Sequence, residues 1–529
     1  MTYSPISRRC SSHLALIFLL FALSSPAQDI GTRSATPVSA SWTTYNGDYS
    51  GRRYSSLNQI NKDNVKSLTL AWAFPTRGNA IKSTPLVVDG ILYFTAPDHV
   101  WAVDPQTGDE IWSYNRPSHG DHLGQRGVAF YNNRVYFGTP DAHLICLDAR
   151  NGKEIWNVEI ADVKFGYYIS TAPLIIHGHV LVGTSGDQSD SEHFIEARDW
   201  ETGARLWHTS SVPRPGSPDA ATWPGAKSMT HGGGSMWLSG TYDPSLNLVY
   251  WGTGNPHPVL DGRIRAGANL YTACILAINP DTGAIAWYFQ ASPHDTHDWD
   301  AVETPVLFDA GFHGKPRHLL AQASRNGFFF VLDRQTGECL LTSQYVPGNW
   351  TLGVDKKGSP IPNPAKEPQP DGVLVNTPTD GATNWMPPSF DPETGLFYVT
   401  AQYGYSYWYL VLDKNGDPVD HEAGGAVGDI TKSALLALDY RTGQPRWQHD
   451  AGDGADWSGV LTTAGHVLFT GDASGNVIAL DPANGSVLWH TRAGGNVNNG
   501  PMTYMMNGRQ YVVTGVADTL FAWALPDNR

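Results

Sequence analysis

Three short segments of the 529-residue chain gather the side chains that could do chemistry. Ser292–Glu303 (SPHDTHDWDAVE) carries three aspartates, two histidines and a tryptophan, His231–Pro258 contains GGGSMW and GTGNP, and Ser324–Gly327 (SRNG) places Arg325 before an apolar strand. Carboxylate and amide oxygens suit a hard cation such as Ca²⁺, arginine suits a carboxylate-bearing ligand, and a tryptophan face suits a flat ring. Each feature alone also fits a turn cap, a loop or a packing contact, but their combination favours one ligand site.

An eleven-residue phrase that usually ends in tryptophan supplies the elements that must position these segments. Its apolar start ends a strand, the central Asp-x-x-Thr-Gly or Asp-x-x-Asn-Gly predicts a turn with glycine at positive φ, and its end begins a second strand. The seven copies are Ala102–Trp112, Cys146–Trp156, Ala197–Trp207, Ala277–Trp287, Val331–Leu341, Ala437–Trp447 and Ala479–Trp489. Such a repeat, with alternating apolar runs between copies, predicts four-stranded antiparallel blades of a β-propeller with the tryptophans packed between blades.

The spacing of the copies predicts how many blades there are. Asp104 and Asp148 are 44 residues apart and Asp439 and Asp481 are 42 apart, which matches one blade. Trp72 lies 40 residues before Trp112 and provides an eighth position. We therefore expect an all-β, eight-bladed propeller in which an N-terminal strand closes the ring near Gln510–Ala524. Seven blades with an irregular extension are the alternative.

The composition excludes some functions and indicates export. The net charge of −15 and the lack of a basic stripe argue against nucleic-acid binding. Arg8 and Arg9, the apolar run Leu14–Leu23 and Ser25-Pro26-Ala27 predict a secretory signal over residues 1–27, followed by one domain over residues 28–529. Because no later segment is long and apolar enough to cross a bilayer, we expect a soluble periplasmic product.

The cysteines do not predict a redox or haem site. Cys146, Cys274 and Cys339 would remain after export, an odd number without a disulfide framework. Cys146 and Cys274 lie in apolar strand contexts, so we expect small buried residues. No C-x-x-C-H motif occurs, so covalent c-type haem is not expected.

The phrase and the segments GGGSMW, GTGNP, PHDTHD, SRNG, Asn384-Trp385 and Trp457-Ser458-Gly459 together resemble the pyrroloquinoline quinone (PQQ) dependent alcohol dehydrogenases of the methanol/ethanol type. The resemblance covers essentially the whole mature chain. It implies an eight-bladed propeller that holds PQQ and a Ca²⁺ or lanthanide ion on its axis. It also implies a small alcohol as substrate and a separate electron acceptor, such as a soluble c-type cytochrome.

The resemblance assigns roles to individual residues. Asp298 matches the catalytic base and Arg325 the arginine beside the quinone carbonyls. Asn255 and Asp298 match metal ligands, and Asp300 resembles the additional carboxylate of lanthanide-dependent relatives, although it would equally cap a turn. Alternate residues of an extended segment point the same way, so both carboxylates would reach one ion. The other cofactor contacts implied are Arg126, Ser170, Ser185, Gly186, Trp237, Asn384 and Trp457.

Three positions depart from the family pattern. Lys82 stands where the family has a glutamate near the cofactor, and it would pair with a PQQ carboxylate or reflect a changed ligand. Gln188 replaces a metal-binding glutamate, which weakens the site unless the preceding Asp187 takes its place. Gly120-Asp121 replaces an adjacent cysteine pair that covers the cofactor in many relatives. These departures keep two rivals open: an assembly or binding scaffold, and a family member without catalysis.

Overall fold

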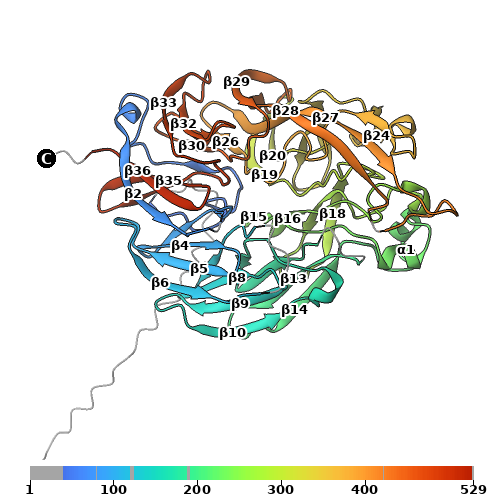
Figure 1. Cartoon of the computed structure of the whole chain (residues 1–529), viewed down its shortest axis with the longest axis horizontal. Helices are drawn as coiled ribbons and strands as arrows, with labels where there is room; N and C mark the ends of the chain where they lie inside the picture. Colours follow the sequence, from blue (N-terminus) through green and yellow to red (C-terminus); the bar gives the residue numbers. More distant parts are fainter. Residues whose placement is uncertain (1–39, 79, 119–123, 187–190, 421, 527–529) are drawn as a thin grey trace, which may run out of the picture.

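The computed structural model describes residues 40–78, 80–118, 124–186, 191–420 and 422–526. The expected signal over residues 1–27 therefore lies outside the described residues. The described chain is built almost entirely of antiparallel strands and is an all-β propeller (Figure 1). Among the described residues, none of the helices has the length and apolar character needed to span a bilayer.

Eight sheets of four or five strands and one two-stranded sheet account for the described strands. Four of the larger sheets follow one another along the chain: β3 (Leu86–Val88), β4 (Ile91–Ala96), β5 (His99–Val103) and β6 (Glu110–Asn115); β7 (Ala129–Tyr131), β8 (Arg134–Gly138), β9 (His143–Asp148) and β10 (Glu154–Glu159); β11 (Leu174–Ile176), β12 (His179–Gly183), β13 (Phe194–Asp199) and β14 (Arg205–Ser210); β15 (Thr241–Asp243), β16 (Leu248–Gly252), β17 (Cys274–Ile278) and β18 (Ile285–Gln290).

The remaining sheets include the ones that join the two ends of the chain. They are β19 (Val306–Phe312), β20 (Lys315–Ala323), β21 (Phe328–Asp333) and β22 (Cys339–Gln344); β25 (Val373–Val375), β26 (Ser389–Asp391), β27 (Leu396–Leu410), β28 (Gly424–Asp439) and β29 (Pro445–Asp453); β1 (Tyr54–Ser55), β30 (Leu461–Thr463), β31 (Val467–Gly471), β32 (Asn476–Leu480) and β33 (Val487–Arg492); β2 (Thr69–Pro75), β34 (Met502–Met506), β35 (Arg509–Val516) and β36 (Thr519–Ala524); and the pair β23 (Thr351–Val354) and β24 (Pro360–Pro362).

Helical segments are short and lie in the connections. The only α-helix of the described residues is α1 (Ala226–Thr230). Short 3₁₀ turns occur at Val65–Ser67, Val163–Phe165, Pro218–Thr222, Gly262–Arg265 and Pro364–Lys366.

The repeated phrase forms the strand–turn–strand that the sequence predicts. In the first copy Asp104 accepts the backbone N–H of Gln106 at 2.7 Å and Gly108 has φ +77°. Trp72 donates its indole N–H to the Pro105 carbonyl at 2.9 Å, and a Cβ at Gly108 would lie 2.8 Å from its ring. The tryptophan of one sheet thus lies on the glycine turn of the next, which explains why this position excludes larger residues. The same arrangement recurs for Trp112 over Gly152.

Strands from the N-terminal and C-terminal parts of the described chain share one sheet, as the sequence predicts. Strand β2 pairs antiparallel with β36, so the blue and red ends of the coloured chain lie side by side in Figure 1. The short strand β1 pairs with β30 of the neighbouring sheet. Buried apolar side chains of adjacent sheets form the core, for example Leu435 of β28 with Leu468 of β31. Cys146 and Cys274 are buried in such clusters, as expected.

Candidate active site

The segment between β18 and β19 carries the central carboxylates and is held from both ends. The Asp295 carboxylate accepts hydrogen bonds from the backbone N–H of Trp299 at 3.0 Å and of His297 at 3.4 Å. The backbone carbonyl of Asp295 accepts a hydrogen bond from the buried guanidinium of Arg265 at 2.5 Å. Burial raises the pKa of Asp295 to about 6, although these N–H donors and Arg265 oppose the rise. Asp298 adopts φ +58°, which the surrounding bonds must maintain.

His297, next to Asp298, is a packing residue. Its ring stacks on Trp299 at 4.5 Å and its Nε2 lies 2.8 Å from the Lys366 carbonyl. Burial lowers its pKa to about 4, so the ring is neutral near pH 7. The histidine therefore packs beside Asp298, between Trp299 and the Lys366 carbonyl, and contributes no charge to the site.

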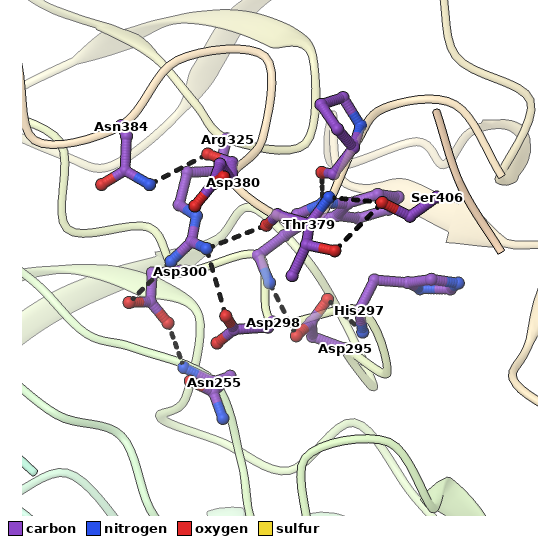
Figure 2. A network of polar contacts seen from close by, with 12 residues as sticks. Asn255, Asp295, His297, Asp298, Asp300, Arg325, Thr379, Asp380, Asn384 and Ser406 are labelled. Carbon is purple, nitrogen blue, oxygen red and sulfur yellow. Dashed lines mark hydrogen bonds and ion pairs between the residues drawn. The ribbon is translucent and has the colours of Figure 1, made fainter. Parts of the chain in front are cut away.

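Arg325 joins the two predicted carboxylates (Figure 2). It lies in the turn between β20 and β21. Its Nη2 is 3.2 Å from Asp298 Oδ2, and its Nη1 is 3.3 Å from Asp300 Oδ2. The Asp300 side chain is only 4 % exposed, whereas that of Asp298 is 36 % exposed and faces an accessible space. Asp298 is thus the carboxylate that a small molecule can reach.

Charge around Arg325 is predominantly negative. Burial alone would lower its pKa, but the carboxylates of Asp298, Asp300, Glu303 and Asp380 outweigh burial and raise it, so the guanidinium stays charged. Burial raises the pKa of Glu303 well above its usual range. Several carboxyl groups thus face one guanidinium, which leaves a region that favours a further cation.

Asp300 is fixed by three donors from separate elements. Besides Arg325, the Asn255 backbone N–H donates at 2.7 Å and the Trp237 indole N–H at 2.6 Å. The glycine run before Trp237 permits this convergence, because a Cβ at Gly233 (φ +73°) would lie 2.7 Å from the Asn255 carbonyl. The GGGSMW and GTGNP segments therefore meet at Asp300.

Two cationic side chains, buried Arg126 and half-buried Lys82, lie beside the rings of Trp237 and Trp385. The guanidinium carbon of Arg126 lies 5.6 Å from the Trp237 ring centroid and 4.5 Å from that of Trp385. Its Nε and Nη1 are buried without a hydrogen-bond partner among the described residues. Lys82 Nζ is 5.9 Å from the Trp385 ring, and burial with the nearby Arg126 lowers its pKa to about 8. Trp385 in turn lies parallel to Trp457, with centroids 6.4 Å apart and 3° between the planes.

The remaining predicted residues either contact Trp237 or form hydrogen bonds within the loops that carry them. Ser170 Oγ lies 3.0 Å from Ser185 Oγ and donates to the Trp237 carbonyl at 2.9 Å, so both serines support Trp237. Asn384 donates its amide to the Asp380 carbonyl at 2.9 Å and accepts the Trp385 N–H, which shapes the loop that carries Trp385. The Gly186 carbonyl contacts the buried His193 ring at 3.1 Å. Asp187, Gln188 and Gly120-Asp121 lie outside the described residues.

Sequence reasoning missed several groups that shape the site. Glu303 closes the quoted segment, and both of its buried carboxyl oxygens lack hydrogen-bond partners in the described part of the chain. Arg265 and Asp295 support the loop from behind, and Thr379 offers its carbonyl to Arg325 at 3.0 Å. The only signal in the sequence is an arginine, Arg265, within a glycine-containing insertion. The Arg265–Asp295 and Arg325–Thr379 bonds cannot be predicted locally, because each joins positions at least 30 residues apart.

The described side chains fit a flat polyanion and a hard cation. Unpartnered guanidinium nitrogens of Arg126, a neighbouring lysine and the indole rings of the site suit a planar molecule with carboxylates. Asp298, Asp300 and the Asn255 amide offer oxygen donors for a cation. No group of three His, Cys, Asp or Glu suited to a metal occurs within the described residues, and the predicted set relies on an amide and on positions 187–188 as well.

Comparison with known proteins agrees with this chemistry. The family model for the β-propeller domain of glucose/ethanol/alcohol dehydrogenases matches residues 42–349, and the model for the outer membrane protein assembly factor BamB matches residues 431–525. Quinoprotein alcohol dehydrogenase PedH of Pseudomonas putida is 36% identical over 89% of this chain and 86% of its own length.

Solved structures extend the likeness to the fold. The quinohemoprotein alcohol dehydrogenase of Comamonas testosteroni superposes with a TM-score of 0.84 at 34% identity, over 93% of this chain and 81% of that one. A europium-containing methanol dehydrogenase superposes with a TM-score of 0.85 at 29% identity, over 92% of this chain and 98% of that one. The resemblance seen in the sequence is thereby confirmed: the chain belongs to the PQQ-dependent quinoprotein alcohol dehydrogenase family.

Proposed function

We propose that this chain is a periplasmic PQQ-dependent dehydrogenase that oxidises a small alcohol and passes the electrons to a separate c-type cytochrome. The observation that carries the proposal is the convergence of Arg325, Asn255 and Trp237 on Asp300. Asp298 shares the Arg325 guanidinium, and Arg126, with two unpartnered nitrogens, lies beside the Trp237 ring. We further propose that residues 28–529 form one domain of eight blades, one for each larger sheet, docked through the tryptophans, and that residues 1–27 are an export signal.

The cofactor-binding residues divide into two groups. Arg126 and Lys82 would hold the carboxylates of PQQ, with Trp237 as the aromatic floor and Ser170, Ser185, Gly186, Asn384 and Trp457 around it. Asn255, Asp298 and Asp300, together with Asp187 or Gln188, would hold Ca²⁺ or a lanthanide ion. When bound, PQQ supplies a two-electron acceptor and the ion supplies Lewis-acid polarisation.

Asp298 and Arg325 would act directly on the substrate. Asp298 is the accessible carboxylate, so it takes the hydroxyl proton of the alcohol on a carboxylate oxygen as the C–H bond is broken. Arg325 orients Asp298 and stabilises negative charge that develops beside it. The Asp300 carboxylate accepts hydrogen bonds from the Trp237 indole N–H and the Asn255 backbone N–H. It therefore fixes the position of the Trp237 ring relative to the proposed cation ligands.

Reconstitution tests the proposed function. The protein is titrated with PQQ in the presence of Ca²⁺ or La³⁺, binding is followed by tryptophan fluorescence, and turnover is followed by dye reduction with primary alcohols. We expect saturable PQQ uptake and alcohol-dependent turnover with at least one ion. Absence of uptake with both ions would favour a scaffold, and uptake without turnover across alcohols, polyols and aldehydes would favour an inactive family member.

Asp298→Asn tests the assigned base. Asparagine retains the size of the side chain but cannot accept the proton, so we expect kcat to fall by about 10²–10⁴-fold. PQQ uptake and the thermal midpoint serve as controls and should change little. A variant that retains full turnover would remove Asp298 from its role as base.

A further inference from the structure

The outer halves of β27 and β28 form a strand pair that extends beyond the sheet. After the irregularity at Tyr403/Gly404, residues 404–410 pair with 424–430, and β25 joins along the other edge. Figure 1 shows this orange pair extending to the side of the molecule where β24 and α1 lie.

One face of this extension is a row of exposed apolar side chains. Tyr407 lies opposite both Leu374 on β25 and Val427 on β28. Their exposed fractions are 48% for Leu374, 44% for Tyr407 and 66% for Val427, and Tyr405, two residues along the same strand, is 47% exposed. Directly opposite residues share a face of a sheet, so the row is continuous. A contiguous exposed apolar row on a soluble protein indicates an interaction site.

The opposite face of the same strands backs onto the candidate active site. Trp408, adjacent to Tyr407, is 1% exposed, and its ring centroid lies 5.1 Å from His297 and 6.5 Å from Trp299. Those two residues flank Asp298 in the chain. The exposed row is therefore separated from the segment that carries Asp298 by one layer of aromatic side chains.

Acidic side chains border the row at the tip of the extension and along β28, whereas Lys366, whose Nζ donates to the Leu374 carbonyl at 3.0 Å, lies on the β25 side. The tip and outer strand of the extension expose the carboxylates of Asp413, Asp417, Asp420, Glu422 and Asp429, with Lys414 among them. Asp429 lies directly opposite Tyr405. An apolar centre with an acidic rim complements a partner with an apolar centre and a basic rim. A second copy of this chain would present the same carboxylates and would be repelled.

We propose that the row Leu374, Tyr405, Tyr407 and Val427, with its acidic rim, is the docking surface for a basic electron-carrier protein. The proposal rests on the proposed function. Oxidation of one alcohol to the aldehyde releases two electrons and two protons, so two ferric one-electron carriers must dock in turn and leave as ferrous proteins. A surface with a small apolar centre and a charged rim suits such brief association, because rim charge speeds encounter and a small contact area permits rapid release.

Val427→Lys tests this surface, with a lysine-rich ferricytochrome c as the probe. A lysine within the row repels the probe, so we expect KM for ferricytochrome c to rise about tenfold at low ionic strength, with kcat and dye-linked turnover unchanged. Asp429→Lys should act in the same direction. Val487→Lys is the matched control, because Val487 is a 51% exposed strand valine on β33, outside the row.

Direct binding separates failure of this proposal from failure of the proposed function. Calorimetric titration of ferricytochrome c into the protein without PQQ needs no turnover, and should show salt-sensitive binding that Val427→Lys weakens and Val487→Lys retains. No binding to the unaltered protein, or equal binding by Val427→Lys, would overturn the docking surface. Sedimentation velocity addresses self-association: a dimer that Val427→Lys dissociates would assign the row to a second copy and overturn the proposal. If the unaltered protein, reconstituted with PQQ, shows no dye-linked turnover, the proposed function is overturned but the docking surface is not.

Discussion

At the scale of single residues, the site combines two regions of opposite charge that share Trp237. Arg126 is buried beside Trp385 and Lys82 is half-buried near the same ring, whereas Asp298 and Asp300 share the single guanidinium of Arg325. Two buried guanidinium nitrogens of Arg126 lack hydrogen-bond partners among the described residues, which costs free energy in the unliganded protein. Binding of a molecule with carboxylates at one end and a metal-chelating edge at the other would offset both imbalances together.

Lys82 should make cofactor affinity depend on pH. Its pKa of about 8 means that the ammonium is charged below pH 8 and progressively neutral above it. We expect PQQ affinity to be constant below pH 8 and to fall as pH rises above 8, since only the charged form attracts a carboxylate. The stability of the unliganded protein depends on pH in the opposite direction. Because the pKa of Lys82 is lower in the folded protein than in the unfolded chain, the free energy of unfolding rises with pH between about 8 and 10.5.

Lys82→Gln isolates this effect. We expect roughly tenfold weaker PQQ binding at pH 7, and no additional decline between pH 7.5 and 9.5, measured by fluorescence titration. The exposed Lys153→Gln is the control and should keep the original profile. An unchanged pH profile in Lys82→Gln would mean that another group titrates.

At the scale of elements, the sequence predicts the strands better than the loops. The phrase around Asp104 and Gly108 determines its own turn, because the cap and the positive-φ glycine are local. The burial of Cys146 and the pairing of the N-terminal strand with Thr519–Ala524 also followed from apolar pattern and repeat phase. The resemblance pointed to Asp298 and Arg325, which lie 3.2 Å apart in the fold, but not to the long extension of β27 and β28, since no repeat or motif encodes it.

The support behind Asp298 was unpredictable for a physical reason. Arg265 reaches Asp295 from an insertion between β16 and β17, and such contacts depend on the fold of that insertion. Asp295 then caps two N–H groups of the loop that holds Asp298 at positive φ. The conformation of this loop thus depends on the Asp295 carboxylate, which contacts backbone N–H groups of the loop and not the Arg325 guanidinium.

Asp295→Asn should separate positioning from folding. An asparagine offers one acceptor oxygen in place of two, so one N–H cap is lost and Asp298 is held less firmly. We expect kcat to fall roughly tenfold, because small misplacements of a catalytic group are costly. The thermal midpoint at pH 7 should not fall, since the raised pKa of about 6 shows that the ionised carboxylate is disfavoured in the fold.

Asp391→Asn is the matched control for this variant. Asp391 is also buried, caps the Glu393 N–H at 2.8 Å and has a raised pKa, but it lies at the end of β26. We expect its kcat to match that of the unaltered protein. Because a merely structural role for Asp295 would move stability and not turnover, a lowered midpoint with unchanged kcat would contradict positioning.

At the scale of the whole molecule, closure of the chain depends on contacts between its two ends. Besides the β2–β36 pair, Arg53 is fully buried and donates to the carbonyls of Tyr45 at 2.8 Å, Val460 at 3.1 Å and Pro501 at 2.6 Å. Its guanidinium carbon also lies 5.1 Å from the Trp42 ring centroid. Burial lowers its pKa to about 10, so it remains charged at pH 7. One side chain therefore joins the N-terminal segment to two C-terminal segments.

Arg53→Met should weaken this joint specifically. Methionine fills much of the space but leaves three buried carbonyls without their donor, and each such loss costs about 1–3 kcal/mol, so we expect a loss of about 3 kcal/mol or more and a lower thermal midpoint. Arg150→Met is the control, because the Arg150 side chain is 77% exposed, and its change should stay within about 0.5 kcal/mol. If the end-to-end joint holds the propeller closed, hydrogen exchange in Arg53→Met should rise first in β2 and β36. Uniform exchange along the chain would instead mean that the sheets hold one another without the joint.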